Sequence, residues 1–99
     1  MRTAVDFHRL AVREYRLARD WYGVRSPAVA QRFKAAIDRA VSRIESEHES
    51  LPILNGRYRW VRVRGFPYIL VCRARSSTMI SVVAVVHGRR RPGYWRRRV

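Results

Sequence analysis

The strongest constraint on the fold is the segment Met79-Ile80-Ser81-Val82-Val83-Ala84-Val85-Val86, in which Ser81 is the only polar residue. The polar turn Arg75-Ser76-Ser77-Thr78 precedes it, and His87 follows it directly. An apolar run of this length predicts a central β-strand that is buried on both faces. Residues 66–72, Phe-Pro-Tyr-Ile-Leu-Val-Cys, predict the preceding strand, which has its proline near the start, where a missing N–H is tolerated.

Residues 57–64 have a period of two and predict another strand. Arg57-Tyr58-Arg59-Trp60 alternates, and Val61-Arg62-Val63-Arg64 alternates with the opposite phase. We therefore predict a bulge or a twist where Trp60 and Val61 are adjacent. Gly65 marks a turn after this strand, and residues 51–56, Leu-Pro-Ile-Leu-Asn-Gly, carry turn chemistry that predicts a loop.

The N-terminal half is predicted to be helical after a short first strand at residues 2–7. Residues 9–23 show helical spacing, and Gly23 is predicted to end this helix. Ser26-Pro27 predicts the start of a second helix that runs to about residue 47. Two helices joined so closely must form an antiparallel hairpin. The residues predicted to face the core include Trp21, Tyr22 and Phe33, together with Val29, Ala36, Ile37, Ala40, Val41 and Ile44.

These elements predict one α+β domain over residues 1–99. Its order is β-α-α-β-β-β, with a small, mostly antiparallel sheet covered on one face by the helical hairpin, and a short tail or partial helix from Pro92. The single cysteine, Cys72, excludes an internal disulfide and is interpreted as a buried, inert thiol. The three histidines have no ligand spacing, so neither a metal nor another cofactor is predicted.

The distribution of charge predicts an anionic partner. All seven acidic residues lie at or before Glu49, so residues 1–49 carry ten cations and a net charge of +3. Residues 50–99 carry twelve arginines and no acid, a net of +12, which completes the total of +15. Arginines packed this densely repel one another unless an anion lies among them, which favours nucleic acid or an acidic protein. Residues 96–98, Arg-Arg-Arg, are interpreted as a disordered basic end.

Neither a secretory signal nor a run of ~20 apolar residues for a membrane helix is apparent, so we expect a cytoplasmic protein without membrane contact.

Three parts of the chain, in order, resemble the RelE/ParE superfamily of toxin–antitoxin toxins, also known as plasmid stabilisation proteins. Near the start, Val5-Asp6-Phe7-His8 leads to Ala11, Glu14, Ala18 and Trp21-Tyr22, similar to the family's first strand and its A..E...A..WY helix. In the middle, residues 62–71, Arg-Val-Arg-Gly-Phe-Pro-Tyr-Ile-Leu-Val, resemble the family's basic strand and its FPY strand. At the end, Ala84-Val85-Val86-His87, Arg90, Pro92 and Tyr94-Trp95 resemble the AV.H..R.P.YW ending of one large branch.

This resemblance implies a toxin that arrests bacterial growth and is silenced by a cognate antitoxin, with which it forms a hetero-oligomer. Antitoxins of this family wrap the toxin with a helical arm that is often disordered when free, and a surface of +12 suits an acidic arm of that kind. RelE-like members cut messenger RNA on the ribosome, whereas ParE-like members inhibit DNA gyrase and need no catalytic residues. The ending of this chain is closer to the ParE-like branch, so gyrase inhibition is our first expectation.

The alternatives are a ribosome-dependent, metal-independent endoribonuclease and a basic binding module that has lost toxicity. A nuclease needs a proton shuttle and cations for the phosphate, and its candidates are His87, Arg89, Arg90 and Tyr94. RelE-like members use lysines on the middle strands. This chain lacks those lysines and has no carboxylate base there, which weakens the case for a nuclease. The residues expected to bind the target or nucleic acid are Arg59, Arg62, Arg64, Arg91 and Trp95. For several of these residues, packing on the sheet or exposure to solvent is the alternative to a functional role.

Overall fold

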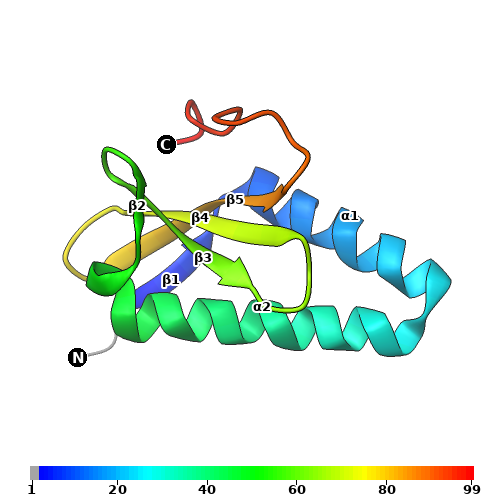
Figure 1. The fold of residues 1–99 in the computed structure, drawn as a ribbon. Helices are drawn as coiled ribbons and strands as arrows, with labels where there is room; N and C mark the ends of the chain where they lie inside the picture. Colours follow the sequence, from blue (N-terminus) through cyan, green and yellow to red (C-terminus); the bar gives the residue numbers. More distant parts are fainter. Residues whose placement is uncertain (1–2) are drawn as a thin grey trace.

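The computed structural model describes residues 3–99, which form two helices and a five-stranded sheet (Figure 1). The predicted α+β fold, a helical hairpin on a mostly antiparallel sheet, is confirmed. One strand was not predicted: the short strand β2 lies within residues 51–56, which were predicted to form a loop. The first strand was predicted to begin at Arg2, which lies outside the described residues. The elements are β1 Ala4–Phe7, α1 Arg9–Arg25, α2 Pro27–Glu47, the 3-10 turn η1 His48–Ser50, β2 Ile53–Asn55, β3 Tyr58–Val63, β4 Tyr68–Ala74 and β5 Met79–His87.

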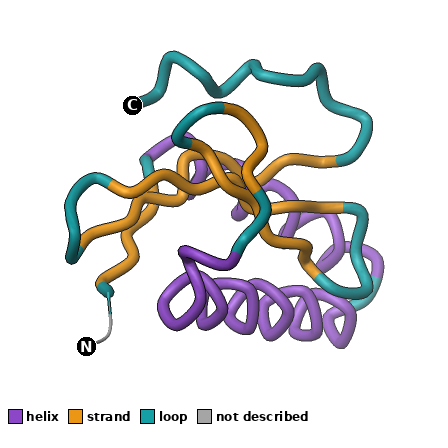
Figure 2. Tube along the Cα trace, turned by 60° about the vertical axis from the view of Figure 1, so that its left-hand side comes forward, coloured by secondary structure: helices purple, strands orange, loops and turns teal. Residues whose placement is uncertain are grey.

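The strand predicted to be central, β5, lies between β1 and β4 in a sheet of order β1-β5-β4-β3-β2. β1 pairs with it in parallel, with Val5 opposite Ile80, whereas the other neighbouring strands are antiparallel. Every β5 residue between Met79 and His87 is buried. The strand is apolar on both faces because α1 and α2 cover one face of the sheet and residues 88–99, which we call the tail, cover the other (Figures 1 and 2).

The irregularity in the sheet lies elsewhere than predicted. β3 and β4 pair without interruption from Tyr58–Arg73 to Val63–Tyr68, so the predicted bulge at Trp60 and Val61 is wrong. The phase appeared to change because Tyr58 on the outer face packs against the tail, while Val61 and Val63 pack against the helices. The register shift instead occurs between β4 and β5, where Val71 pairs with Ala84 and Cys72 pairs with Val82. The extra residue, Val83, lets both Val83 and Ala84 join the outer cluster.

Helix α1 ends later than predicted. Gly23 lies within it, and the helix continues to Arg25 because the N–H of Ser26 still donates to the carbonyl oxygen of Tyr22 at 2.7 Å. The same Ser26 begins α2, since its hydroxyl accepts the N–H of Val29 at 3.4 Å and Pro27 occupies the first turn. A single residue therefore joins the two helices and forces the hairpin.

The inner core confirms Phe33, which is fully buried, and places Tyr22 in an aromatic cluster with Phe33, Phe66 and Tyr68. The prediction that Trp21 belongs to the core is wrong, because its side chain is 53% exposed. Neighbouring residues on a helix point about 100° apart, so the inward direction of Tyr22 turns Trp21 out to the edge of the hairpin. Cys72 is buried as predicted, and burial raises the pKa of its thiol to about 12.

The tail crosses the side of the sheet opposite the helices (Figure 2). The partial helix predicted from Pro92 is wrong: the tail forms successive turns, with N–H to carbonyl hydrogen bonds from Arg96 to Gly93 and from Arg98 to Trp95. Gly93 has a φ of 77°, which is incompatible with a right-handed helix. Neither α1 nor α2, the two α-helices described within residues 3–99, combines the length and the apolar character that a membrane-spanning segment requires.

Candidate functional site

The end of β5 directs the chain back over the sheet. Gly88 donates its N–H to the carbonyl oxygen of Pro67 at 2.9 Å, which ties the turn to the start of β4. The Nδ1 atom of His87 accepts the N–H of Arg89 at 3.0 Å, and its ring packs edge-on against Tyr68 with centroids 5.0 Å apart. This engagement of Nδ1 leaves Nε2 as the protonated nitrogen when the ring is neutral. His87 therefore shapes the turn that presents Arg89 and Arg90.

Trp95 anchors the tail on the outer face of the sheet. Its side chain is 3% exposed and belongs to the cluster of Val71, Val83, Ala84 and Val86. The ring of Tyr58 meets it edge-on at 4.6 Å, and the Tyr58 hydroxyl donates to the main-chain oxygens of Arg96 and Val99 at 3.2 Å each. The outer face is thus a second small core, and the tail supplies its largest side chain.

Glu14 on α1 forms the second anchor. Its carboxylate accepts hydrogen bonds from the N–H of Val85 at 2.9 Å, the hydroxyl of Tyr94 at 2.7 Å, and two guanidinium N–H groups of Arg98 at 2.9 and 3.0 Å. Arg98 also donates to the carbonyl oxygen of Val83 at 3.0 Å. The Arg98 and Glu14 side chains are only 13% and 14% exposed.

This role of Glu14 was not predicted from the sequence, and the assignment of Arg98 to a disordered end is wrong. A buried carboxylate on another element holds the guanidinium with two charge-assisted hydrogen bonds, which offset the entropy of ordering the tail. A signal was available in the sequence. Glu14 lies four residues after Leu10 and three before Leu17, beside the apolar stripe of the helix, where an acid needs a partner.

Tyr94 is held as a neutral phenol. Burial raises the pKa of its hydroxyl far above the ordinary value for tyrosine, and the hydrogen bond to Glu14 raises it further. The Arg90 guanidinium lies over the Tyr94 ring at 4.0 Å from the centroid. Tyr94 therefore positions Arg90, and its phenol does not act as a base near neutral pH.

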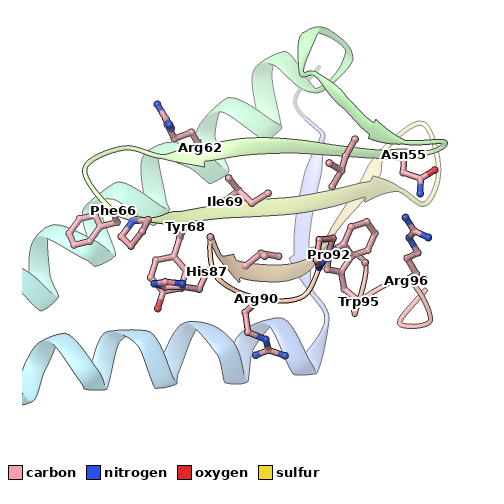
Figure 3. A pocket seen from close by; sticks show the side chains of 15 residues that line it. Asn55, Arg62, Phe66, Tyr68, Ile69, His87, Arg90, Pro92, Trp95 and Arg96 are labelled. Carbon is pink, nitrogen blue, oxygen red and sulfur yellow. The ribbon is translucent and has the colours of Figure 1, made fainter.

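A cleft lies between the tail and the outer face of the sheet, with a volume of about 410 Å³. Figure 3 shows Ile69, Pro92 and Trp95 turned towards this space, while Arg62 and Arg90 extend from opposite sides of it. None of the cleft's arginines forms an ion pair with a described residue. We call this space the tail cleft; it has an apolar floor, and its rim is formed by three arginines and a histidine: Arg62, Arg90, Arg96 and His87.

A second hollow, the α1 groove, lies on the other side of His87 and Arg90 and has a volume of about 520 Å³. Its wall on α1 carries two exposed apolar side chains, Leu17 at 60% and Trp21 at 53% exposure. The Arg25 guanidinium lies 3.5 Å from the centroid of the Trp21 ring. His87 and Arg90 thus form a ridge between two concave surfaces.

The structure gathers some of the predicted site residues and separates others. His87, Arg90, Arg62 and Trp95 all line the tail cleft, and Tyr94 packs beneath Arg90. Arg59 points away from the cleft, because its Nη1 donates to the carbonyl oxygens of Glu49 at 3.1 Å and Leu51 at 2.7 Å and so fixes the loop before β2. The remaining three predicted residues are exposed and line neither hollow: Arg64, Arg89 and Arg91.

Fold and site together define a small basic α+β protein whose arginine-rich tail is docked on the face of the sheet away from the helices. The same fold occurs in a solved structure described as the chromosomal ParDE TA system from P. aeruginosa, with a TM-score of 0.73 and 16% sequence identity. The alignment covers 86% of this chain and 95% of that chain. No sequence among the curated proteins matches.

The family model for the ParE toxin of type II toxin-antitoxin system, parDE, matches residues 5–92. The chain therefore belongs to the ParE toxin family of type II toxin–antitoxin systems, and the resemblance to the RelE/ParE superfamily is confirmed. Membership of a two-component family also implies an antitoxin as a partner.

Proposed function

We propose that this protein is a toxin that arrests growth by inhibiting DNA gyrase, and that the tail cleft is the surface that engages the enzyme or its DNA. The observation that carries the proposal is the anchored tail, which presents Arg90 and Arg96 with Arg62 around an apolar floor. A fixed cationic rim attracts an acidic surface or a phosphate, and the floor accepts an apolar group of the target.

Binding suits this cleft better than catalysis. Metal-free RNA cleavage requires a free base for the 2′-hydroxyl and an acid for the leaving oxygen. Tyr94 is held neutral because burial, and then its hydrogen bond to Glu14, raise the pKa of its hydroxyl, and the Nδ1 atom of His87 already accepts the N–H of Arg89. The tail cleft has no carboxylate among its lining residues. These features favour a gyrase inhibitor over a ribosome-dependent nuclease.

The proposal is tested by following labelled thymidine and labelled methionine in a bacterial host during the first minutes after induction. Incorporation of thymidine should fall first, because gyrase supports the advancing replication fork. If incorporation of methionine falls first, the target is translation and the gyrase proposal fails. If neither falls, the chain is a binding module without toxicity.

Removing two cations from the rim should weaken the inhibition of purified gyrase. We expect Arg62→Ala/Arg90→Ala to raise the concentration needed for half-inhibition of supercoiling at least ~100-fold, since each of the two charge-assisted contacts contributes about 1.5–3 kcal/mol. The matched control is Arg13→Ala/Arg16→Ala, which removes the same charge from an exposed part of α1. Equal inhibition by both double variants would show that the tail cleft is not the target surface.

We propose further that the antitoxin neutralises the toxin by binding in the α1 groove with an acidic, amphipathic segment. Leu17 and Trp21 offer apolar contacts there, and Arg25 and Arg90 lie beside them to receive carboxylates. Such a segment would cover one side of the His87–Arg90 ridge and would block access to the tail cleft. A segment that is disordered when free gains its order from these contacts.

The substitution Leu17→Asp should weaken antitoxin binding at least ~100-fold, because it places a carboxylate among the apolar contacts and opposite acidic partner groups. Its exposure of 60% means that the fold should tolerate it. The control is Ile53→Asp, which introduces the same change on β2, where Ile53 is 62% exposed. Titration calorimetry with the antitoxin checks the prediction, and comparable losses in the two variants would place the interface elsewhere.

A further inference from the structure

A third concave surface lies between α2 and the turn that joins β3 to β4. It has a volume of about 440 Å³ and is lined by three arginines from two separate elements, Arg32 and Arg39 on α2 and Arg64 at the turn. We call it the α2 hollow; its remaining lining is Val29, Ala35, Gly65 and Phe66. It shares only Phe66 with the tail cleft and no residue with the α1 groove.

The acids of α2 leave these arginines free. Asp38 pairs with Lys34 at 3.1 Å, and Glu47 pairs with Arg43 at 3.4 Å. Within residues 3–99, Arg32, Arg39 and Arg64 form neither an ion pair nor a side-chain hydrogen bond, and all three are exposed. Three uncompensated guanidinium groups around one hollow create a positive potential that attracts an anion.

The geometry of the hollow suits a regularly spaced row of anions. Arg32 and Arg39 are seven residues apart on one side of α2, which places them about 10 Å apart along the helix axis. Each strand of duplex DNA presents a phosphate about every 3.4 Å along its axis, so both arginines and Arg64 can contact phosphates of one duplex. Arginine forms bidentate hydrogen bonds with phosphate oxygens. Between the arginines, Ala35 and Gly65 have little or no side chain, which lets a backbone approach closely.

The lining also distinguishes a duplex from the other anionic partners. An acidic protein segment needs apolar anchors, and the large exposed apolar side chains of the described residues lie elsewhere, on α1 and β2. Single-stranded nucleic acid needs free aromatic faces for stacking. Phe66 does not supply one, because it is half-buried against Tyr22 and Phe33 with ring centroids 5.1 and 5.0 Å apart.

From these observations we infer that the α2 hollow binds the phosphate backbone of double-stranded DNA without regard to sequence, through Arg32, Arg39 and Arg64. This goes beyond inhibition of gyrase, since the contact requires no enzyme and involves a surface separate from the tail cleft. A toxin held on DNA by this hollow would keep its tail free to meet a DNA-bound target.

The test is direct binding of the purified full chain to a fluorescein-labelled duplex of arbitrary sequence, measured by anisotropy between about 50 and 200 mM salt. The variant Arg32→Glu/Arg39→Glu/Arg64→Glu is compared with Arg9→Glu/Arg13→Glu/Arg16→Glu, which changes the net charge equally at exposed positions of α1. We expect the first variant to bind at least ~100-fold more weakly than the second. For the α2 variant, the negative slope of log affinity against log salt should be shallower than that of the wild type by about 2.7, or 0.9 for each lost phosphate contact.

Equal losses in the two triple variants would overturn the proposal, because binding would then follow net charge alone. A large loss in Arg89→Glu/Arg90→Glu/Arg91→Glu, with the α2 variant binding as well as the α1 control, would place DNA on the tail instead and would also overturn it. Polyglutamate serves as a probe for an acidic protein. If it binds more tightly than the duplex, and if the α2 variant loses that binding, the hollow is assigned to an acidic protein. Circular dichroism confirms that each variant is folded, and none of these outcomes depends on whether gyrase is inhibited.

Discussion

Replacing Glu14 by alanine should lower the free energy of unfolding by about 3–5 kcal/mol, which is the usual effect of removing one partner from a buried ion pair. The substitution leaves the guanidinium of Arg98 without a counterion at 13% exposure and removes the acceptor for the hydroxyl of Tyr94 and the N–H of Val85. The tail would then lose its attachment to α1. Urea denaturation followed by far-ultraviolet circular dichroism measures the change.

The matched control is Glu47→Ala, which removes a carboxylate from the exposed pair with Arg43, where the two side chains are 47% and 52% exposed. Exposed pairs contribute about 0–1 kcal/mol, so the control should differ little from the wild type. The double variant Glu14→Met/Arg98→Met should recover the part of the loss that comes from the unpaired guanidinium, because it removes both charges and fills similar volume. A single-variant loss below 1 kcal/mol would mean that the pair does not hold the tail.

Replacing Trp95 by alanine should cost about 3–5 kcal/mol, as is usual when a large aromatic side chain is removed from a core. Trp95 is 3% exposed and packs against Val71, Val83 and Tyr58. The same variant should lose inhibition of gyrase if our functional proposal is correct, because Arg90 and Arg96 would no longer be held at the rim of the tail cleft. Urea denaturation and a supercoiling assay measure the two effects.

Trp21→Ala is the control for this prediction, since it removes the same side chain from a position that is 53% exposed. We expect it to cost only about 1–2 kcal/mol, because about half of its surface stays in water in the folded protein. Inhibition of gyrase should also be retained, although binding of the antitoxin should weaken. If Trp95→Ala is as stable as Trp21→Ala, the outer face of the sheet does not need the tail.

The elements that were predicted well are those whose signal is local. The apolar run of β5, the Ser26-Pro27 start of α2 and the helical stripe through Phe33 each depend on residues within a few positions of one another. Backbone geometry fixes the period of a helix or strand, so a pattern of apolar side chains reports which face is buried. The elements missed, such as the three-residue strand β2, are too short to carry a period.

The candidate site was predicted in part. The sequence indicated His87, Arg90 and Trp95 as a group because they are adjacent in the chain, and the structure places them on one cleft. It also grouped Arg59, Arg62 and Arg64, since all three lie in the strand predicted over residues 57–64. The structure separates these three, because Arg59 caps the loop before β2, Arg62 lines the tail cleft and Arg64 borders the α2 hollow.

Composition, charge and periodicity alone were sufficient to establish the α+β class, the helical hairpin and a C-terminal half that carries twelve arginines and no acid. Only the tertiary structure decided that the tail is a docked layer and that Glu14 is its counterion, across 84 positions of the chain. The physical reason is that pairing between distant residues depends on which faces of the sheet remain uncovered after the helices have packed. Which segment covers a free face of the sheet depends on the whole molecule, so it produces no periodic pattern in the local sequence.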